Sequence, residues 1–160
     1  MKKLIFTFYV LLLCNSMYAQ DSLNFDFEIL KEKEAIGWSS FGNKEYNIVY
    51  DTAISQNGVT SASIEGNGNT EEFRVLTYTI PADFGGKKIK LTGYLKTENI
   101  VNGWAGLWMR IDPDISIDNM ESRKVQGTTD WKKYEVELET NNNATSISFG
   151  GLIVGTGKIW

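Results

Sequence analysis

The alternation of apolar and polar side chains is the feature that most limits what this chain can fold into. Beyond about residue 20 the sequence has almost no helical periodicity, and short alternating runs are separated by Gly, Asn, Asp and Ser. In residues 88–96, for example, Ile89, Leu91, Gly93 and Leu95 alternate with polar or amphipathic side chains. Because alternate side chains of a strand point to opposite faces of a sheet, such a run has one apolar and one wet face. Many short strands joined by turn residues predict an all-β sandwich or barrel.

The same pattern indicates where the strands lie. Residues 72–80 carry apolar side chains on both faces, which favours a strand in the middle of a sheet. The predicted strands span residues 24–28, 46–51, 61–65, 72–80, 88–97, 104–111, 132–139, 146–154 and 158–160.

Residues 1–19 have the organisation of a secretory signal peptide. Lys2 and Lys3 give a positive start, residues 4–13 form an apolar run, and Ala19 is a small residue suited to a cleavage site. The run is shorter than the roughly 20 apolar residues of a transmembrane helix. We therefore expect cleavage before Gln20 and a protein that is secreted, or periplasmic or in the cell envelope, with no membrane contact after cleavage.

Cys14 is the only cysteine and leaves open a second interpretation, in which it is lipidated. A lipidated cysteine usually follows a small residue, whereas Leu13 precedes this one, so we favour the signal-peptide interpretation. The mature chain then has no disulfide and depends on its hydrophobic core. Its length of about 140 residues is enough for one domain, residues 20–160.

Charge and composition exclude several classes of function. Removal of Lys2 and Lys3 changes the formal net charge from -4 to -6, which argues against nucleic acid or an anionic membrane surface as partner. The sequence has no histidine, so triads that use histidine as the base are excluded. A zinc site is not expected either, because the mature chain offers neither histidine nor cysteine as ligands.

The last residues, GTGKIW at positions 155–160, look like the opening of a strand. Domains commonly complete their last strand and end in a polar tail. We therefore interpret residues 20–160 as a domain truncated at its C-terminus, lacking its final strand. Any catalytic domain downstream would then also be missing.

Several segments occur in the order found in a known family. They are NFDFE at residues 24–28, IGW at 36–38, IPAD at 80–83, GKKIKLTGYLKT at 86–97, TTDWKKY at 128–134 and the closing GTGKIW. Most of residues 24–160 thereby resembles the galactose-binding-like jelly rolls, particularly carbohydrate-binding modules of the CenC type. The sequence is also similar to the N-terminal accessory domains of secreted bacterial S41-type peptidases and erythromycin-esterase-like proteins.

This resemblance implies an antiparallel jelly-roll β-sandwich and glycan binding without catalysis. Related domains often hold a structural calcium ion with an acidic residue just after the position equivalent to Trp160. This sequence stops before that residue, so we expect no cofactor and no metal site.

The stretch GWAGLWMRID, residues 103–112, is the candidate binding surface. At strand period, Trp104, Trp108 and Arg110 share one face, and Tyr94 could lie on a neighbouring strand. Tryptophan rings can stack on the C–H faces of sugars, while Arg110 and Asp112 would contact hydroxyl groups. The alternative is that both tryptophans are buried, with Arg110 over a ring as a cation–π pair.

An acidic loop follows this stretch, with Asp112, Asp114, Asp118 and Glu121. Its spacing does not match an EF-hand, so we interpret these residues as a solvated loop. Catalysis by a pair of carboxylates remains the third possibility for function, because sequence alone gives no distances between acids.

The sequence therefore predicts a secreted, non-catalytic carbohydrate-binding module with Trp104, Trp108, Arg110, Asp112 and Tyr94 at its site. The alternative is a structural or interaction domain of a larger peptidase or esterase. Its partner is accordingly either a glycan or a downstream catalytic domain.

Overall fold

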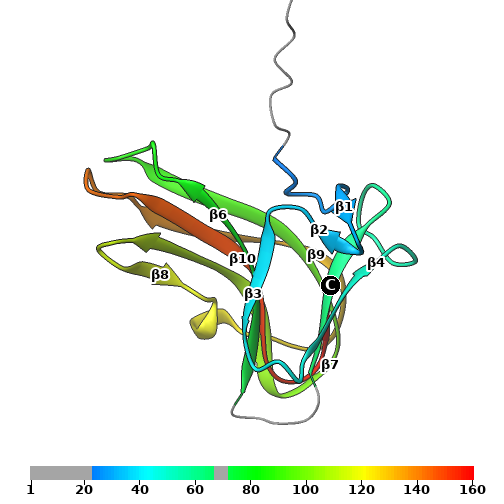
Figure 1. Ribbon diagram of the computed structural model, residues 1–160. Coiled ribbons are helices and arrows are strands. Elements are labelled where there is room, and N and C mark those ends of the chain that lie inside the picture. The colour runs from blue at the N-terminus through cyan, green and yellow to red at the C-terminus, as the bar shows by residue number, and fades with distance from the viewer. Residues whose placement is uncertain (1–22, 67–71) are drawn as a thin grey trace, which may run out of the picture.

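The computed structural model describes residues 23–66 and 72–160, and nearly all of its regular structure is β-strand (Figure 1). A short 3-10 turn, Glu121–Arg123, is the exception among the described residues. The strands are β1 (Leu30–Lys31), β2 (Glu34–Ala35), β3 (Trp38–Gly42), β4 (Asn47–Asp51), β5 (Ser61–Gly66), β6 (Phe73–Pro81), β7 (Lys88–Asp112), β8 (Ser116–Asp118), β9 (Val125–Glu139) and β10 (Ser146–Ile159).

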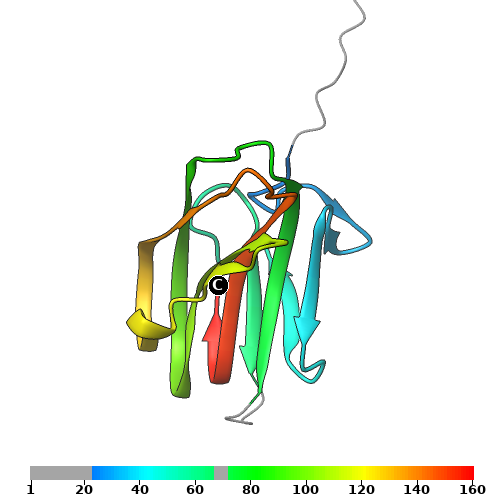
Figure 2. The same ribbon diagram turned by 90° about the vertical axis from the view of Figure 1, so that its left-hand side faces the viewer.

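Two long bent strands, β7 and β10, organise the molecule. The end of β7 pairs with the start of β10, which also pairs with β6, and β3 follows β6. The start of β7 pairs with β9, while the end of β10 pairs with β5, which leads to β4. The antiparallel sheet therefore curls into two facing parts (Figures 1 and 2). The β6 half consists of β3, β6, the end of β7 and the start of β10. The β9 half consists of β4, β5, β9, the start of β7 and the end of β10.

The bend in β10 is located at two glycines. The register between β7 and β10 shifts on either side of Thr156, and Gly155 and Gly157 have φ angles of 81° and 109°. A Cβ at Gly155 would lie 2.6 Å from the carbonyl oxygen of Asn102, and one at Gly157 would lie 2.5 Å from that of Asn99. Only glycine can adopt this backbone and leave room for the neighbouring strand.

The core lies between the two halves. On the inward face of β10, Ile147 and Ile153 are almost fully buried, and so are Met109 and Ile111 on β7. Val136 contributes from β9 in the opposite half and is also fully buried. The alternation in the sequence thus predicted the inward faces correctly, and the all-β sandwich is confirmed.

The structure also corrects and extends the predicted strands. Residues 24–28 form a turn rather than a strand. The reason is the buried side chain of Asn24, whose Nδ2 donates to the carbonyls of Ile29 and Ile36 and whose Oδ1 accepts from the Ile29 amide. These side-chain bonds replace the ladder that a strand would need. The segments predicted at 88–97 and 104–111 are one strand, β7, and those at 146–154 and 158–160 merge in β10.

The remaining expectations concern the strand at residues 72–80, the signal peptide and the membrane. The strand predicted at 72–80 is β6, which lies mid-sheet between β3 and β10, as expected. The signal peptide and Cys14 lie outside the described residues, so cleavage before Gln20 stays a prediction. In the described part of the chain, no helix has the length and apolar character needed to cross a membrane.

Candidate functional site

Trp108 lies on the outer face of the β6 half, but its ring is covered. The side chain is 5% exposed and packs with Val75 and Leu152 in a small second hydrophobic cluster. Its indole Nε1 donates to the carbonyl of Leu76 at 3.3 Å, and the ring of Phe41 meets it edge-on at 5.6 Å. The buried ring therefore offers little surface on which a sugar could stack.

Trp104 is adjacent but half-buried. It packs against the same cluster, and Lys124 places its Nζ 4.6 Å from the ring centroid. The cation on this tryptophan is thus Lys124, whereas the sequence had suggested Arg110. A sugar-binding role for Trp104 stays a prediction, and Lys124 already occupies one face of its ring.

Arg110 and Asp112 are engaged with each other. Arg110 donates from Nε to both carboxylate oxygens of Asp112 at 3.0 Å and from Nη2 to Oδ1 at 2.6 Å. These bonds, followed by the Coulombic attraction of Asp112, raise the pKa of the Arg110 guanidinium further above its usual value. A sugar hydroxyl would have to compete with this two-pronged pair.

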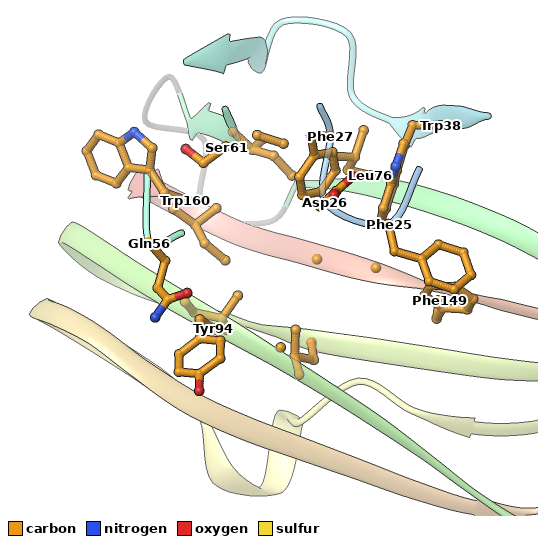
Figure 3. Close-up of a pocket in the computed structure, with 18 of the residues that line it drawn as sticks. Phe25, Asp26, Phe27, Trp38, Gln56, Ser61, Leu76, Tyr94, Phe149 and Trp160 are labelled. Atoms are coloured by element: carbon orange, nitrogen blue, oxygen red, sulfur yellow. The ribbon is translucent and has the colours of Figure 1, made fainter. Parts of the chain in front are cut away.

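Tyr94 does not join the two tryptophans. It projects from the first part of β7, in the β9 half, and is 46% exposed. The structure instead places Tyr94 at a cavity between the two halves, with Gln56 nearby (Figure 3). The five site residues predicted from the sequence therefore fall into an outer group of four and this separate tyrosine.

The cavity arises from a missing side chain in the inner face. Gly151 occupies an inward position of β10, opposite Leu107 on β7 and Leu76 on β6. A Cβ built at Gly151 meets no atom within 4 Å, so the space in front of it is open. The resulting cavity has a volume of about 340 Å³ and is bounded by both halves of the sheet. This volume lies within the range of small-molecule sites, roughly 300–1,000 Å³.

Aromatic side chains line much of this cavity. Figure 3 shows Trp160 and Gln56 toward one end, and Trp38, Phe25 and Phe149 toward the other. The ring of Phe25 meets that of Phe149 edge-on, with centroids 5.1 Å apart. The aromatic lining residues are Phe25, Phe27, Trp38, Tyr94, Trp131, Phe149 and Trp160.

Polar side chains reach the cavity mainly from two loops. The N-terminal turn contributes Asp26, and the loop after β4 contributes Gln56 and Asn57. Thr60, Ser61 and Thr92 complete the polar lining. A cavity that combines aromatic surface with a few converging polar groups is the arrangement expected of a ligand site.

Two carboxylates hold the loop after β4 in place. Glu28 accepts hydrogen bonds from the amides of Val59 at 2.7 Å and Thr60 at 3.0 Å. The Thr60 amide, followed by that of Val59, holds the pKa of Glu28 below its usual value. Since Glu28 belongs to the N-terminal segment, this bond joins the two segments that carry the polar lining.

Asp51 fastens the other end of the same loop. It accepts the indole N–H of Trp160 at 3.1 Å and the amides of Ala53 and Ile54. The Trp160 bond, followed by that of Ala53, lowers the pKa of the Asp51 carboxyl. The indole of Trp160 is thereby held beside the start of this loop, and the Trp160 backbone pairs with that of Lys96.

The acidic loop after β7 is used for contacts within the protein. Asp118 binds the guanidinium of Arg123 and accepts the Met120 amide, while Asp114 accepts from Asn141. Burial opposes ionisation of Asp118, but the bonds to Arg123 and the Met120 amide outweigh it and lower the pKa. Within residues 23–66 and 72–160, no group of three or more acidic, cysteine or histidine side chains is arranged to hold a metal ion.

Solved structures with the same fold include carbohydrate-binding modules and part of the enzymatically active domain of bacteriophage CBA120 tailspike protein 4, which matches at a TM-score of 0.57 and 12% identity over 79% of this chain and 18% of that one. A family 22 xylan-binding domain superposes with a TM-score of 0.57 at 9% identity, covering 80% of this chain and 84% of that one. A family 61 module in complex with beta-1,4-galactotriose gives a TM-score of 0.52 at 13% identity, covering 79% and 84%. These likenesses show that the chain has the galactose-binding-like jelly-roll fold.

The same fold occurs within longer proteins. The CBM22-1–GH10 part of xylanase 10B from Clostridium thermocellum, complexed with xylohexaose, matches at a TM-score of 0.52 and 12% identity, over 78% of this chain and 26% of that one.

In sequence, the chain is 29% identical over 144 residues to an uncharacterized HTH-type transcriptional regulator, YbfP, of Bacillus subtilis (strain 168). That alignment covers 83% of this chain, which spans about half (48%) of the curated relative. No family model matches the chain.

Proposed function

We propose that this domain is a non-catalytic glycan-binding module and that its site is the cavity between the two halves of the sheet. The observation that carries the proposal is the open space in front of Gly151, lined by aromatic and polar residues. The fold supports it, because the solved structures that share it include modules bound to galactotriose and xylohexaose.

The lining residues suit the chemistry of a sugar. The C–H face of a sugar ring packs against aromatic surface, which Phe25, Trp38 and Trp131 can supply. Sugar hydroxyls both donate and accept hydrogen bonds, and so do the amide side chains of Gln56 and Asn57. Binding in this way requires no bond to be broken, so the chain itself would act as a targeting or sensing domain.

The wider context of this role also forms part of the proposal. A signal peptide would deliver the domain to the cell envelope or beyond, where glycans are accessible. A longer protein would then use it to bring another domain to its ligand, in line with the modular xylanase and the curated relative described above.

Substitution at Gly151 tests the site directly. Gly151→Leu would fill the cavity from a position where added atoms meet open space, so the domain should stay folded. We expect wild-type protein to bind β-1,4-galactotriose or xylohexaose in isothermal titration calorimetry, and Gly151→Leu to bind at least tenfold more weakly.

Phe41→Ser is the matched control, because it removes an exposed aromatic from the outer face and leaves the cavity untouched. Its affinity should equal that of the wild type. If Phe41→Ser abolished binding while Gly151→Leu bound normally, the cavity would not be the site.

A second candidate function is an interaction surface on the outer face of the β6 half. Phe41 and Phe73, which touch edge-on at 6.2 Å, are 45% and 41% exposed above the Trp108 cluster. Exposed aromatic side chains of this kind are common at protein interfaces. In this role the domain would pack against a neighbouring domain, and Phe41→Ser would weaken that packing without changing glycan binding.

A further inference from the structure

The geometry points to a specificity within the proposed glycan site: the cavity takes the end of an uncharged glycan and rejects sugars that carry a carboxylate. This inference rests on the proposed function, since it concerns the same cavity. It follows from two observations, the charges of the lining and the small size of the space.

The charge of the cavity lining is negative. Among the described residues that bound the cavity there is the carboxylate of Asp26 and neither lysine nor arginine. A sugar carboxylate that enters such a space loses water and gains no cation in return, which is strongly unfavourable. It would also be repelled by Asp26, whereas a hydroxyl at the same position could donate a hydrogen bond to that carboxylate.

Two lysines near the lining, Lys158 and Lys96, are already paired. Lys158 places its Nζ 4.7 Å from the ring centroid of Trp160, which lines the cavity. The same Nζ lies 3.8 Å from the carboxylate of Glu65, which is not part of the lining. Lys96 is likewise paired, with Asp130 at 3.1 Å. Neither lysine therefore replaces the missing counter-charge for an acidic sugar.

The small size of the cavity selects for a chain end. Its volume of about 340 Å³ is near the lower limit of small-molecule sites, which leaves room for about one or two sugar rings. Aromatic side chains stand toward both of its ends, with Trp160 on one side and Trp38 and Phe149 on the other (Figure 3). The interior of a long polysaccharide needs an open groove through which both ends of the chain continue.

The charge selectivity is tested with sugars that differ in one group. Galactose and galacturonate, or glucose and glucuronate, differ only in the hydroxymethyl or carboxylate at C6. We expect the neutral sugar of a pair to bind at least tenfold more tightly at pH 7, measured by saturation-transfer NMR or calorimetry. Asp26→Asn should reduce this preference severalfold, because it removes the repelling charge. Equal affinity for the neutral and acidic sugars would overturn the inference.

The stoichiometry on a long neutral polysaccharide, galactan or xylan of known length, tests the chain-end aspect. Binding to ends gives one bound protein per end at saturation, whatever the chain length. Several proteins per chain, increasing with length, would overturn the inference while leaving glycan binding in place. If none of these sugars binds and Gly151→Leu behaves like the wild type, the proposed function itself fails, which distinguishes the two cases.

Discussion

Replacement of Trp108 by alanine should cost stability and leave glycan affinity unchanged. The side chain is 5% exposed and packs with Val75 and Leu152 on the outer face, so its removal leaves a void beneath Phe41. An aromatic side chain buries about 150–250 Å², which corresponds to about 4–6 kcal/mol at roughly 25 cal/mol per Å². Alanine retains a little of this burial free energy, and buried Trp→Ala changes typically cost about 3–5 kcal/mol. For a domain of this size, the loss lowers the melting temperature by about 10–15 °C.

Urea unfolding followed by circular dichroism measures this free energy without relying on tryptophan fluorescence. Tyr94→Ala is the matched control for stability: Tyr94 is 46% exposed, so the variant should stay within about 1 kcal/mol of the wild type. If Trp108→Ala does not fold, Trp108→Phe provides a smaller loss in the same direction. A cooperative Trp108→Ala variant that is destabilised by less than about 1 kcal/mol, but no longer binds sugar, would refute this reasoning and restore Trp108 as a binding residue.

Three further predictions concern the elements that shape the site. The pKa of Glu28 is lowered in the folded state, so its stabilising bonds to the Val59 and Thr60 amides are present above pH about 4.5 and are lost as the pH falls through the lowered value. In acid unfolding curves, the difference in stability between wild type and Glu28→Gln should therefore narrow below that pH. A difference that stays constant with pH would contradict this prediction. Asn24→Ala should destabilise the domain by about 1–3 kcal/mol in urea unfolding, because the backbone groups of Ile29 and Ile36 lose their hydrogen-bond partner in the Asn24 amide. Gly103→Ala should lower the melting temperature strongly in calorimetry, since its Cβ would lie 1.9 Å from the Val154 carbonyl oxygen, whereas Gly151→Ala meets open space and should leave it unchanged; similar effects of the two would be inconsistent with the structure.

Local alternation was enough to predict the positions of most long strands and their faces, although residues 24–28 form a turn. Residues such as Ile89, Leu91 and Ile147 lie on the inward faces assigned from their period of two, because side-chain direction in a strand depends only on position along it. The same logic placed Trp104 and Trp108 on one face. It could not say whether that face was covered, because burial of Trp108 depends on Phe41 and Val75, which come from β3 and β6.

The cavity was missed for a related reason, although the sequence holds a signal for it. Gly151 continues the inward series Ile147 and Phe149 on β10, and a glycine at an inward position marks a place where the core lacks a side chain. Gly93 also fills such a position, but a Cβ at Gly93 would lie 2.9 Å from the side chain of Leu107, whereas one at Gly151 meets open space. Only the packing of the opposite half distinguishes a close approach from a cavity.

The sequence by itself therefore determined the fold class and the inward faces of the main strands. The tertiary structure decided which aromatic side chains are covered, where an open space remains, and that the N-terminal turn and the loop after β4 meet through Glu28. The physical reason is that alternation is a property of neighbouring residues along one strand. Burial, cavities and the pairing of charges depend on residues that are distant in sequence and meet only when the sheet curls on itself.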